Sequence, residues 1–478
     1  MAFVHGPLPQ RLKIAHGFGA VAFGVKDSGF SFFLLIFYNQ VLGMDAGLVS
    51  LALACALLVD AVVDPILGNL SDRTYSRWGR RLPWLYAAAL PLALAWAVLW
   101  NPAVDGTPGF GELLAIAIVV RLLLSACEVP SVSLLPEITA DYDERTTLFR
   151  YRYLFGWLGG LLMMALAYTV FMRGPDGLLD AGGYSPFGIC GAILIFVSVV
   201  GSAIGQHRLV AHVPADRPPP FSIRQAFSEI REAFSERAFL IFAVGALAAY
   251  VSQGMTFSIT NYVNLFVWQF NQLALTVYPA ILFLSVVLMF FVVGPLHRRL
   301  GKPRSAAWSS IAAVIFMLIP YLLFLAGFWP AAGSTASTVG YYAFLLVANT
   351  SGIVTMISGS SMIAEIVEAF QERTGRRAEG SFYSGNWFVQ KCATGVGIFL
   401  TGQIVAVSGL PTDAAQGSVR DEVLTRMILL YGGASVVLAI LAAYWLARFP
   451  ITREEHEARV RAMDLAARGD IDGGTTGP

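Results

Sequence analysis

The sequence is poor in charged residues and in cysteine. Only 13% of its 478 residues are charged and 56% are hydrophobic, so the chain lacks the polar residues that cover a soluble globule. The net charge of +1 provides no broad field to attract nucleic acid. Cys55, Cys127, Cys190 and Cys392 are scattered without a CxxC or Cys/His cluster, which argues against a disulfide framework or zinc site. These deficits argue against a soluble enzyme, a disordered chain and a nucleic-acid binder.

Long apolar runs are abundant instead. A helix needs about 20 apolar residues to cross a bilayer, and the first residues lack the pattern of a cleavable signal peptide. No P-loop is present, so ATP is not expected to bind. The runs predict an all-α polytopic membrane protein with twelve transmembrane helices, at 14–42, 47–69, 82–101, 110–135, 150–172, 187–207, 238–266, 273–296, 304–328, 338–366, 381–408 and 423–449.

Arginines cluster in the loops that follow the even-numbered runs. The loops after odd-numbered runs contain almost none, with Arg173 and Arg420 as the exceptions. Because cytoplasmic loops of membrane proteins are enriched in Lys and Arg, we expect both termini and the longest loop to face the cytoplasm. The expected location is the cell (inner) membrane, with the bilayer as the surrounding partner.

The longest loop divides the chain into two halves of six spans each. We expect an N-terminal bundle at 1–207, a cytoplasmic middle loop at 208–237, a C-terminal bundle at 238–449 and a cytoplasmic tail at 450–478. The tail begins as a charged helix and ends in a stretch expected to be disordered. An amphipathic helix at the inner surface is expected in the middle loop, with its apolar face formed by Ile223, Ala226, Phe227, Ile230 and Phe234.

Ionisable residues inside the spans identify a candidate site, because each costs about 2.5–3.5 kcal/mol on insertion scales. Asp60 and Asp64 are four residues apart and therefore share one face of a helix. Two buried carboxylates this close repel each other, so a proton or a small cation is expected to relieve them. The alternative is permanent neutralisation by arginine or lysine.

Other spans contribute polar groups that can reach this pair. Glu128 can approach from the fourth span, with Ser125 about one turn away, or can instead pair with Arg121 two turns away. The chain has four lysines among 32 basic residues, and Lys26 and Lys391 lie within spans. Because an ammonium is a compact charge on a flexible stem, a lysine that faces the aspartates can exchange partners with them.

A repeated loop relates the two halves. GNLSDRTYSRWGRR follows the second run and GPLHRRLGKPR follows the eighth. The pattern resembles the loop motif of the major facilitator superfamily, in which two six-helix halves are related by an axis along the membrane normal. The second copy is degenerate, and the first keeps Gly68, Asp72, Arg73, Gly79, Arg80 and Arg81.

A narrower resemblance covers nearly the whole chain. The segments KDSGFSFFLLIFYNQVLGM, VDAVVDPILGNLSDRTYSRWGRRLPW, ADYDERTTLFRYRYLFGWLGG and TGRRAEGSFYSGNWFVQKCATGVG resemble the glycoside–pentoside–hexuronide:cation symporter family. The resemblance implies a monomeric transporter, not an enzyme, that moves a sugar or glycoside together with H⁺ or Na⁺ by alternating access and needs no cofactor. Animal lysolipid transporters also belong to this family, so a lysolipid or other amphiphile is the alternative substrate.

The resemblance also implies roles for the buried polar residues. Asp60 and Asp64 would bind the cation, as metal ligands if the ion is sodium, and Ser125 would supply a supporting oxygen. Lys391 would couple this site to the substrate. The substrate-binding residues would be Asp27, Glu128 and Arg152 (or Arg150), with Lys26 as their neighbour.

Two positions depart from the family pattern. Sodium-using members often have a polar residue where this chain has Val63. A proton is therefore at least as well favoured as sodium as the coupling ion. The aromatic residue that would stack on a sugar is replaced by Val132. Other aromatic side chains could hold a sugar ring instead, namely Tyr153, Trp157, Tyr262, Trp387 and Phe388.

Overall fold

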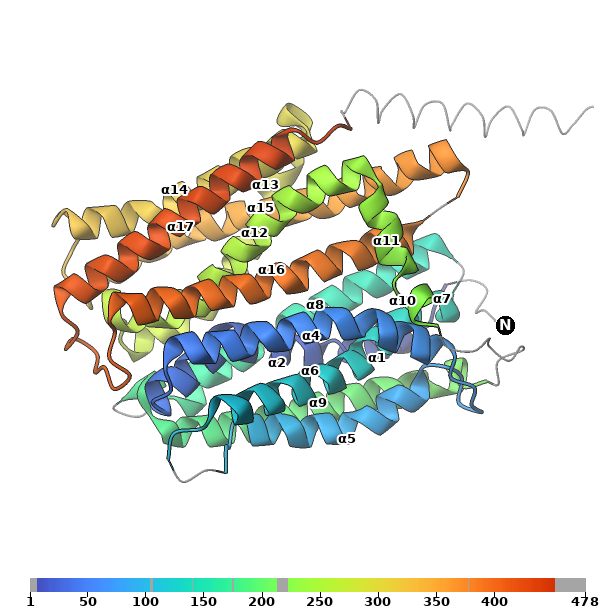
Figure 1. Ribbon diagram of the computed structural model, residues 1–478, viewed down its shortest axis with the longest axis horizontal. Helices are drawn as coiled ribbons and strands as arrows, with labels where there is room; N and C mark the ends of the chain where they lie inside the picture. The colour runs from blue at the N-terminus through green and yellow to red at the C-terminus, as the bar shows by residue number, and fades with distance from the viewer. Residues whose placement is uncertain are drawn as a thin grey trace, which may run out of the picture.

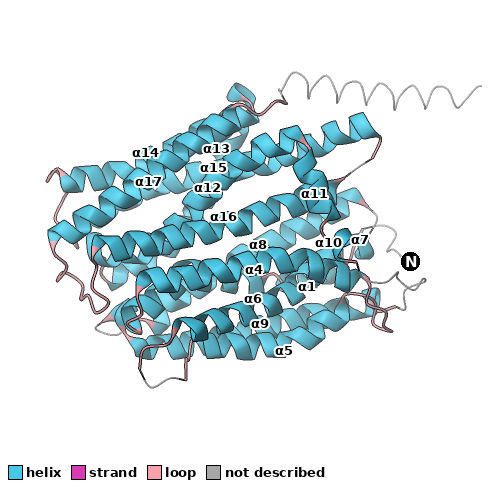
Figure 2. Ribbon diagram, in the orientation of Figure 1, coloured by secondary structure: helices cyan, strands magenta, loops and turns pink. Residues whose placement is uncertain are grey.

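The computed structural model describes residues 7–103, 106–139, 141–173, 176–212, 222–376 and 378–451, and within these ranges the chain forms helices and loops without a strand (Figure 2). Twelve helical segments of the described chain are long and apolar enough to cross a bilayer. The predicted all-α class and number of spans are therefore confirmed.

The first half contains six spans. Span 1 is composed of several consecutive helical pieces, spans 2 and 3 are single helices, and span 4 consists of α6 and the short α7. The elements are α1 (Gln10–Phe18), α2 (Val21–Ser28), η1 (Gly29–Phe33), α3 (Leu34–Ile36), η2 (Phe37–Val41), α4 (Ala46–Asp72), α5 (Leu82–Leu99), α6 (Phe110–Ser133), α7 (Leu135–Ile138), α8 (Tyr142–Leu166), η3 (Ala167–Phe171), η4 (Gly177–Leu179) and α9 (Ala181–Val210).

The second half follows after two short helices of the middle segment. Its spans begin at α12 and are again connected by short loops. The elements are α10 (Ile223–Ala226), α11 (Ser228–Ser235), α12 (Arg237–Tyr262), η5 (Val263–Val267), α13 (Gln272–Leu300), α14 (Lys302–Leu325), α15 (Thr335–Thr374), α16 (Glu379–Ser408) and α17 (Asp421–Ala447).

The spans form two bundles that lie against each other (Figure 1). In the first bundle α5 packs on α9 and α6, and α4 packs on α6. In the second, α14 packs on α15 and α17, while α12 packs on α16 and α17. The blue α4 and the orange α16 lie side by side in Figure 1 and form the most extensive contact between the bundles. This arrangement confirms the two six-helix bundles of the predicted fold.

Small residues allow α4 and α16 to approach closely. A Cβ atom added at Gly402 would lie 2.0 Å from Ser50 Oγ and 2.4 Å from the Ala46 carbonyl oxygen. At Gly395 it would lie 3.4 Å from the Ala54 carbonyl oxygen. Because small residues let helix backbones pack tightly in a membrane, this contact places the polar residues of α4 and α16 within bonding distance.

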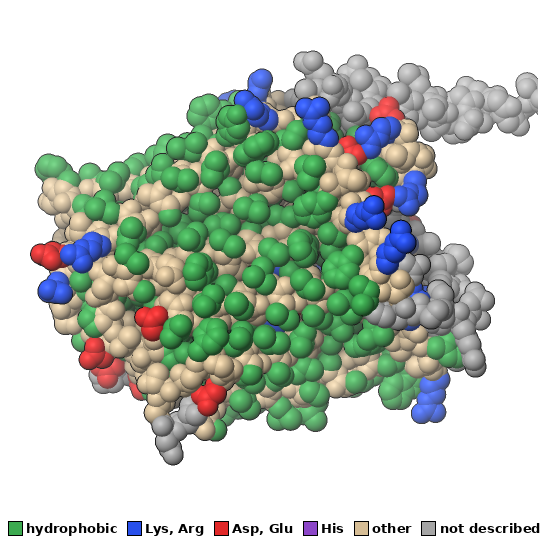
Figure 3. Space-filling model, viewed as in Figure 1, with side chains coloured by type: hydrophobic (Ala, Val, Ile, Leu, Met, Phe, Trp, Pro, Cys, Tyr) green, Lys and Arg blue, Asp and Glu red, His purple; other side chains and the backbone are tan. Residues whose placement is uncertain are grey.

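The outer surface has the distribution expected of a membrane protein. Hydrophobic side chains cover the middle of the face seen in Figure 3, and Lys, Arg, Asp and Glu are found near its two ends. Large apolar side chains such as Phe290, Phe291 and Trp308 are 70%, 73% and 59% exposed. In water such a surface would be unfavourable, whereas lipid tails solvate it.

The middle segment differs from the single helix expected there. It consists of two short helices, α10 and α11, separated by a turn at Phe227. Ile230 is buried and Phe234 packs on Phe239 and Phe388, so α11 lies on the C-terminal bundle, while Ile223 is exposed. The apolar face of α11 therefore contacts protein. The charged helix expected in the tail at 450–478 begins at Thr452 and lies outside the described residues, which end at Ile451.

Candidate functional site

Asp60 and Asp64 of α4 meet Lys391 of α16 at the boundary between the bundles. The Lys391 Nζ atom lies 3.0 Å from Asp60 Oδ2 and also donates a hydrogen bond to Asp64 Oδ2. The Asp60 side chain is 3% exposed and that of Asp64 is 22% exposed. One ammonium of the C-terminal bundle thus contacts two carboxylates of the N-terminal bundle, and the structure brings these three predicted residues together.

Two residues of α6 contact Asp60 from within its own bundle. Ser125 Oγ donates to Asp60 Oδ1 at 2.5 Å, and Arg121 Nη1 lies 3.6 Å from Asp60 Oδ2. The Arg121 guanidinium is buried and lies 4.1 Å from the centroid of the Phe30 ring. The alternative pairing of Arg121 with Glu128 is therefore wrong. Arg121 pairs with Asp60 of the neighbouring helix α4, and Glu128 pairs with Lys26.

Lys26 of α2 joins the two other predicted acidic residues. Its Nζ atom lies 2.8 Å from Asp27 Oδ1 and 3.7 Å from Glu128 Oε2. Lys26 is buried, yet the side chains of Asp27 and Glu128 are 68% and 32% exposed. Both carboxylates therefore keep accessible oxygens that can accept hydrogen bonds from a ligand.

Arg152 of α8 lies inside the bundle, whereas Arg150 is exposed. Arg152 Nη1 donates to Ser131 Oγ at 2.7 Å, and its guanidinium carbon lies 5.5 Å from the centroid of the Phe23 ring. Among the described residues no carboxylate lies within ion-pair distance of Arg152. Of the two arginines that the sequence left open, Arg152 is thus the one with buried donors.

The helix α6 connects the two charged groups. Arg121 and Ser125 contact Asp60 of α4, and Glu128 contacts Lys26 of α2. These three residues follow at spacings of four and three, which places them along one face of the helix. A ligand bound at Glu128 is therefore one turn away from Ser125, which donates a hydrogen bond to Asp60.

The aromatic residues expected near a sugar fall into two sets. Tyr153 is 64% exposed, and Trp157 and Trp387 are both 39% exposed. By contrast, Tyr262 is buried and Phe388 packs on Phe234. The first set can contact a ligand or lipid, while the second is engaged in packing.

The loop motif after α4 forms a compact ionic contact. Arg81 donates to Asp72, to Ser71 Oγ at 2.5 Å and to Glu137 Oε1 at 3.3 Å. Burial lowers the pKa of the Arg81 guanidinium, and the charge of Glu137 opposes this shift. Gly79 has φ +84°, a conformation that favours glycine.

The other motif residues, Gly68, Arg73 and Arg80, lie outside the ionic contact of Arg81 with Asp72 and Glu137. Arg73 donates to Asn69 Oδ1 at 2.7 Å, and a Cβ atom at Gly68 would lie 3.5 Å from Val129. Arg80 is half-buried. Through Arg81, the motif thus joins the end of α4, at Asp72, to the end of span 4, at Glu137.

Neutral side chains join the bundles at the ends of the spans away from the arginine-rich loops. Tyr168 donates to Asn261 at 2.6 Å, and Asn261 donates to the Phe32 carbonyl oxygen at 2.7 Å. Tyr262 donates to Asn39 at 3.0 Å. Of this cluster the sequence singled out Tyr262 alone, as an aromatic surface for a sugar, since amides and phenols in apolar runs carry no charge that marks them.

The same ends contain π-helical turns. They are η1 and η2 in span 1, η3 in span 5 and η5 in span 7. Asn39 lies in η2, and Asn261 and Tyr262 directly precede η5. Because π-helical turns shift the register of the following side chains and are frequent at functional sites, these segments help to direct the neutral side chains across the boundary.

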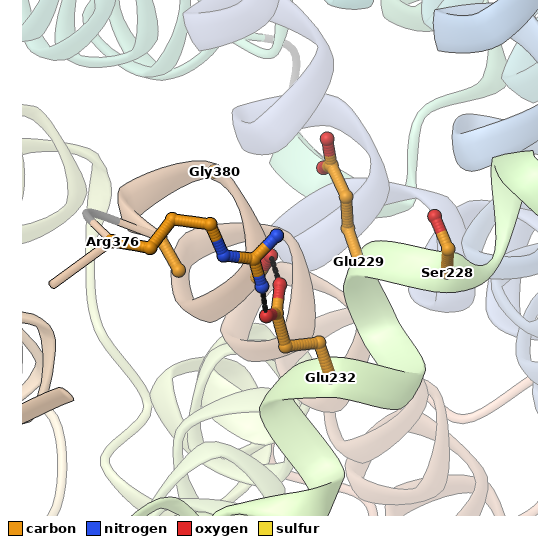
Figure 4. Close-up of a pocket in the computed structure, with 7 residues that line it drawn as sticks. Ser228, Glu229, Glu232, Arg376 and Gly380 are labelled. Carbon is orange, nitrogen blue, oxygen red and sulfur yellow. Dashed lines mark hydrogen bonds and ion pairs between the residues drawn. The ribbon is translucent and has the colours of Figure 1, made fainter. Parts of the chain in front are cut away.

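A surface pocket lies elsewhere, between α11 and the start of α16 (Figure 4). Its lining includes Ser228, Glu229, Glu232, Arg376 and Ser381, and Arg376 donates to Glu232. Ser381 Oγ also donates to Glu232, at 2.6 Å. None of the predicted site residues lines this pocket. The hydrogen bonds of Glu232 with Arg376 and Ser381 hold α11 on the C-terminal bundle.

Twelve spans in two bundles with ion pairs at their boundary define a polytopic transporter of the major facilitator type. A family model described as MFS/sugar transport protein matches residues 15–453. The chain therefore belongs to this family of transporters and is not an enzyme.

Curated relatives and a solved structure agree with this class. The putative glycoside/cation symporter YagG of Escherichia coli is 26% identical, with 97% of each chain covered. The isoprimeverose transporter of Lactiplantibacillus pentosus is 25% identical over 86% of this chain and 83% of its own. A bacterial homologue of the lysosomal transporter Spinster, solved inward-facing and unoccupied, has a TM-score of 0.67 at 13% identity, covering 93% and 98% of the chains. The last likeness is one of fold alone.

Proposed function

We propose that the protein is a secondary active transporter that carries a sugar or glycoside together with a cation, H⁺ or Na⁺, by alternating access. It would lie in the cell (inner) membrane with both termini in the cytoplasm. The relatives described above are named for glycoside/cation symport and isoprimeverose transport, which supports this substrate class. The lysolipid alternative has no comparable support.

The contact of Lys391 with Asp60 and Asp64 is the observation that carries the proposal. The aspartates belong to the N-terminal bundle and the lysine to the C-terminal bundle. When two bundles rock against each other, such a contact must break in at least one conformation. A carboxylate that loses its lysine in a membrane needs another positive charge, which an entering cation would supply.

The substrate would bind beside the Asp60–Asp64 pair. Asp27 and Glu128 have accessible carboxylate oxygens, and Arg152 has N–H groups in excess of its single bond to Ser131. Acceptors and donors of this kind match the hydroxyl groups of a sugar. Lys26 would orient the two acids, and Tyr153 or Trp157 could supply the aromatic surface.

Coupling would follow from the shared helix α6. Ser125 contacts Asp60, and Glu128 lies one turn further. A cation that rearranges the aspartate pair would then change the position of the substrate acceptor, and by linkage the substrate would change cation affinity by the same factor. The contacts of Arg81 with Asp72 and Glu137 would help to hold the cytoplasmic end of α4 and the α7 end of span 4 together during this motion.

The test is uptake by the purified protein in lipid vesicles, with a panel of sugars, glycosides and lysolipids. Each compound is measured with no gradient, with a pH gradient and with a sodium gradient. The proposal expects at least one sugar or glycoside to accumulate against its concentration only when a cation gradient is imposed, and the Asp64→Asn variant to lose this accumulation. Gradient-driven uptake that survives Asp64→Asn would contradict the assigned cation site.

A further inference from the structure

Arg121 is a buried cation in the middle of α6. Its residue exposure is 6%, its guanidinium lies over the Phe30 ring, and its Nη1 atom is 3.6 Å from Asp60 Oδ2. A guanidinium cannot release its proton in a protein. Asp60 therefore has a permanent positive charge beside it.

Both oxygens of Asp60 are already engaged. Oδ1 accepts the hydrogen bond of Ser125, and Oδ2 faces Lys391 as well as Arg121. Sodium, like other hard cations, needs several oxygen ligands around it. The pair offers one free buried acceptor among the described residues, Asp64 Oδ1. Two carboxylates here face two side-chain cations, so the residues present do not fit a sodium ion.

The two side-chain cations differ in how they are held. Lys391 is on α16 and belongs to the opposite bundle, so a relative motion of the bundles can remove it. Arg121, Asp60 and Phe30 all belong to the N-terminal bundle, in which α6 packs along α4. Rigid-body rocking leaves contacts within a bundle intact. Arg121 therefore accompanies Asp60 throughout the cycle.

We propose that Arg121 is a built-in counter-ion for Asp60 that prevents sodium from binding to the Asp60–Asp64 pair. Arg121 is then the residue that determines the cation specificity of this transporter. The inference rests on the proposed function and narrows it, because it removes sodium as the coupling ion. A sodium ion between the aspartates would have to lie beside a fixed guanidinium, and like charges in a site of low polarity repel strongly.

The first test uses sodium alone on the purified wild-type protein. The midpoint of thermal unfolding is measured in sodium chloride and in choline chloride of equal concentration and pH. Because a ligand that binds only the folded state raises its stability by mass action, the inference expects equal midpoints in the two salts. A midpoint that rises with sodium concentration and saturates would overturn it.

The second test changes Arg121. Arg121→Gln removes the charge and leaves Asp60 and Asp64 with Lys391 alone, so this variant is expected to gain a saturable stabilisation by sodium. Arg121→Lys keeps a positive charge and is expected to remain insensitive to sodium. Sodium stabilisation of the lysine variant equal to that of the glutamine variant would contradict the counter-ion role. If Arg121→Gln does not fold, saturable stabilisation of the wild type or of the Arg121→Lys variant by sodium would still overturn the inference.

Vesicle uptake distinguishes failure of this inference from failure of the proposed function. Uptake of a sugar or glycoside that responds to a pH gradient and is unchanged when choline replaces sodium supports both. Uptake that rises several-fold with a sodium gradient keeps the symporter and overturns the role of Arg121. No cation-driven uptake of any sugar or glycoside would contradict the proposed function itself.

Discussion

Lys391 of the C-terminal bundle contacts Asp64 of the N-terminal bundle and is shared with Asp60. An interaction of this kind differs from an ion pair within one bundle, such as that of Lys302 with Glu365 at 2.7 Å. If the bundles rock against each other as proposed, the pair within a bundle stays intact in every conformation. The pair between bundles favours only those conformations that bring α4 and α16 together.

Replacing Lys391 with alanine should strongly reduce gradient-driven uptake. The change leaves two carboxylates with a single side-chain cation, Arg121. Removing one partner of a buried ion pair destabilises a protein by about 3–5 kcal/mol. We expect the initial rate of gradient-driven uptake to fall at least about tenfold, which corresponds to roughly 1.4 kcal/mol.

The matched control for this prediction is Lys13→Ala. Lys13 pairs with Glu144 at 2.8 Å, and both residues belong to the N-terminal bundle. This variant should keep uptake within about twofold of wild type, because rocking of the bundles leaves a contact within one bundle intact. Equal loss in both variants would indicate a general effect on folding and would contradict the specific role of Lys391.

Glu128→Gln should weaken substrate binding and leave the protein folded. The amide keeps the size of the side chain but loses the charge that pairs with Lys26 at 3.7 Å, and a hydrogen bond to a charged group contributes about 1.5–3 kcal/mol. We therefore expect a rise in the apparent Km of counterflow exchange by about tenfold or more, with an unchanged unfolding midpoint.

Glu112→Gln is the control on the same helix. The Glu112 carboxylate accepts a hydrogen bond from the Gly109 backbone N–H at 2.8 Å at the start of α6, where the Gln amide oxygen can also accept. Its counterflow kinetics should match those of wild type. A Glu128→Gln protein with unaltered Km would show that this carboxylate does not bind substrate.

Asn261→Ala should open the boundary between the bundles at the end away from the arginine-rich loops. The change removes the bonds of Asn261 with Tyr168 and with the Phe32 carbonyl oxygen, each worth about 0.5–1.5 kcal/mol net. The population of conformations open at that end should rise by up to about a hundredfold, since each 1.4 kcal/mol is tenfold.

The opening can be measured by thiol labelling. The four native cysteines are first replaced by serine or alanine, and Asn264, which is buried near the cluster, is changed to cysteine. Labelling of this cysteine by an impermeant maleimide should be faster with Asn261→Ala than without it. An equal labelling rate would mean that these hydrogen bonds do not hold the bundles together.

The fold and the charged site could be predicted from sequence because both leave strong local signals. Apolar runs of sufficient length mark the spans, and a charge such as Asp60 or Lys391 within a run marks a costly position. The partner of Arg121 could not be predicted in the same way. Spacing along α6 favours Glu128, but the distance to Asp60 depends on how α4 packs against α6.

The contacts between the bundles could not be predicted for a related reason. Asn39, Asn261 and Tyr168 are neutral and lie in apolar segments, where single polar residues are common. Their pairing depends on long-range packing and on the π-helical turns beside them. The break between α10 and α11 likewise reflects tertiary packing of Ile230 and Phe234 on the C-terminal bundle, which overrides the amphipathic pattern of the segment.

Gly402→Ala should destabilise the observed contact of α4 with α16. The added methyl group would lie 2.0 Å from Ser50 Oγ and 2.4 Å from the Ala46 carbonyl oxygen, so the helices must separate there. Overpacking of this kind costs about 1–3 kcal/mol, and the unfolding midpoint should fall accordingly. Gly433→Ala on α17 is the control, because its added Cβ atom would meet nothing within 4 Å. A Gly402→Ala protein as stable as the Gly433→Ala protein would mean that α4 and α16 do not approach as closely as this packing requires.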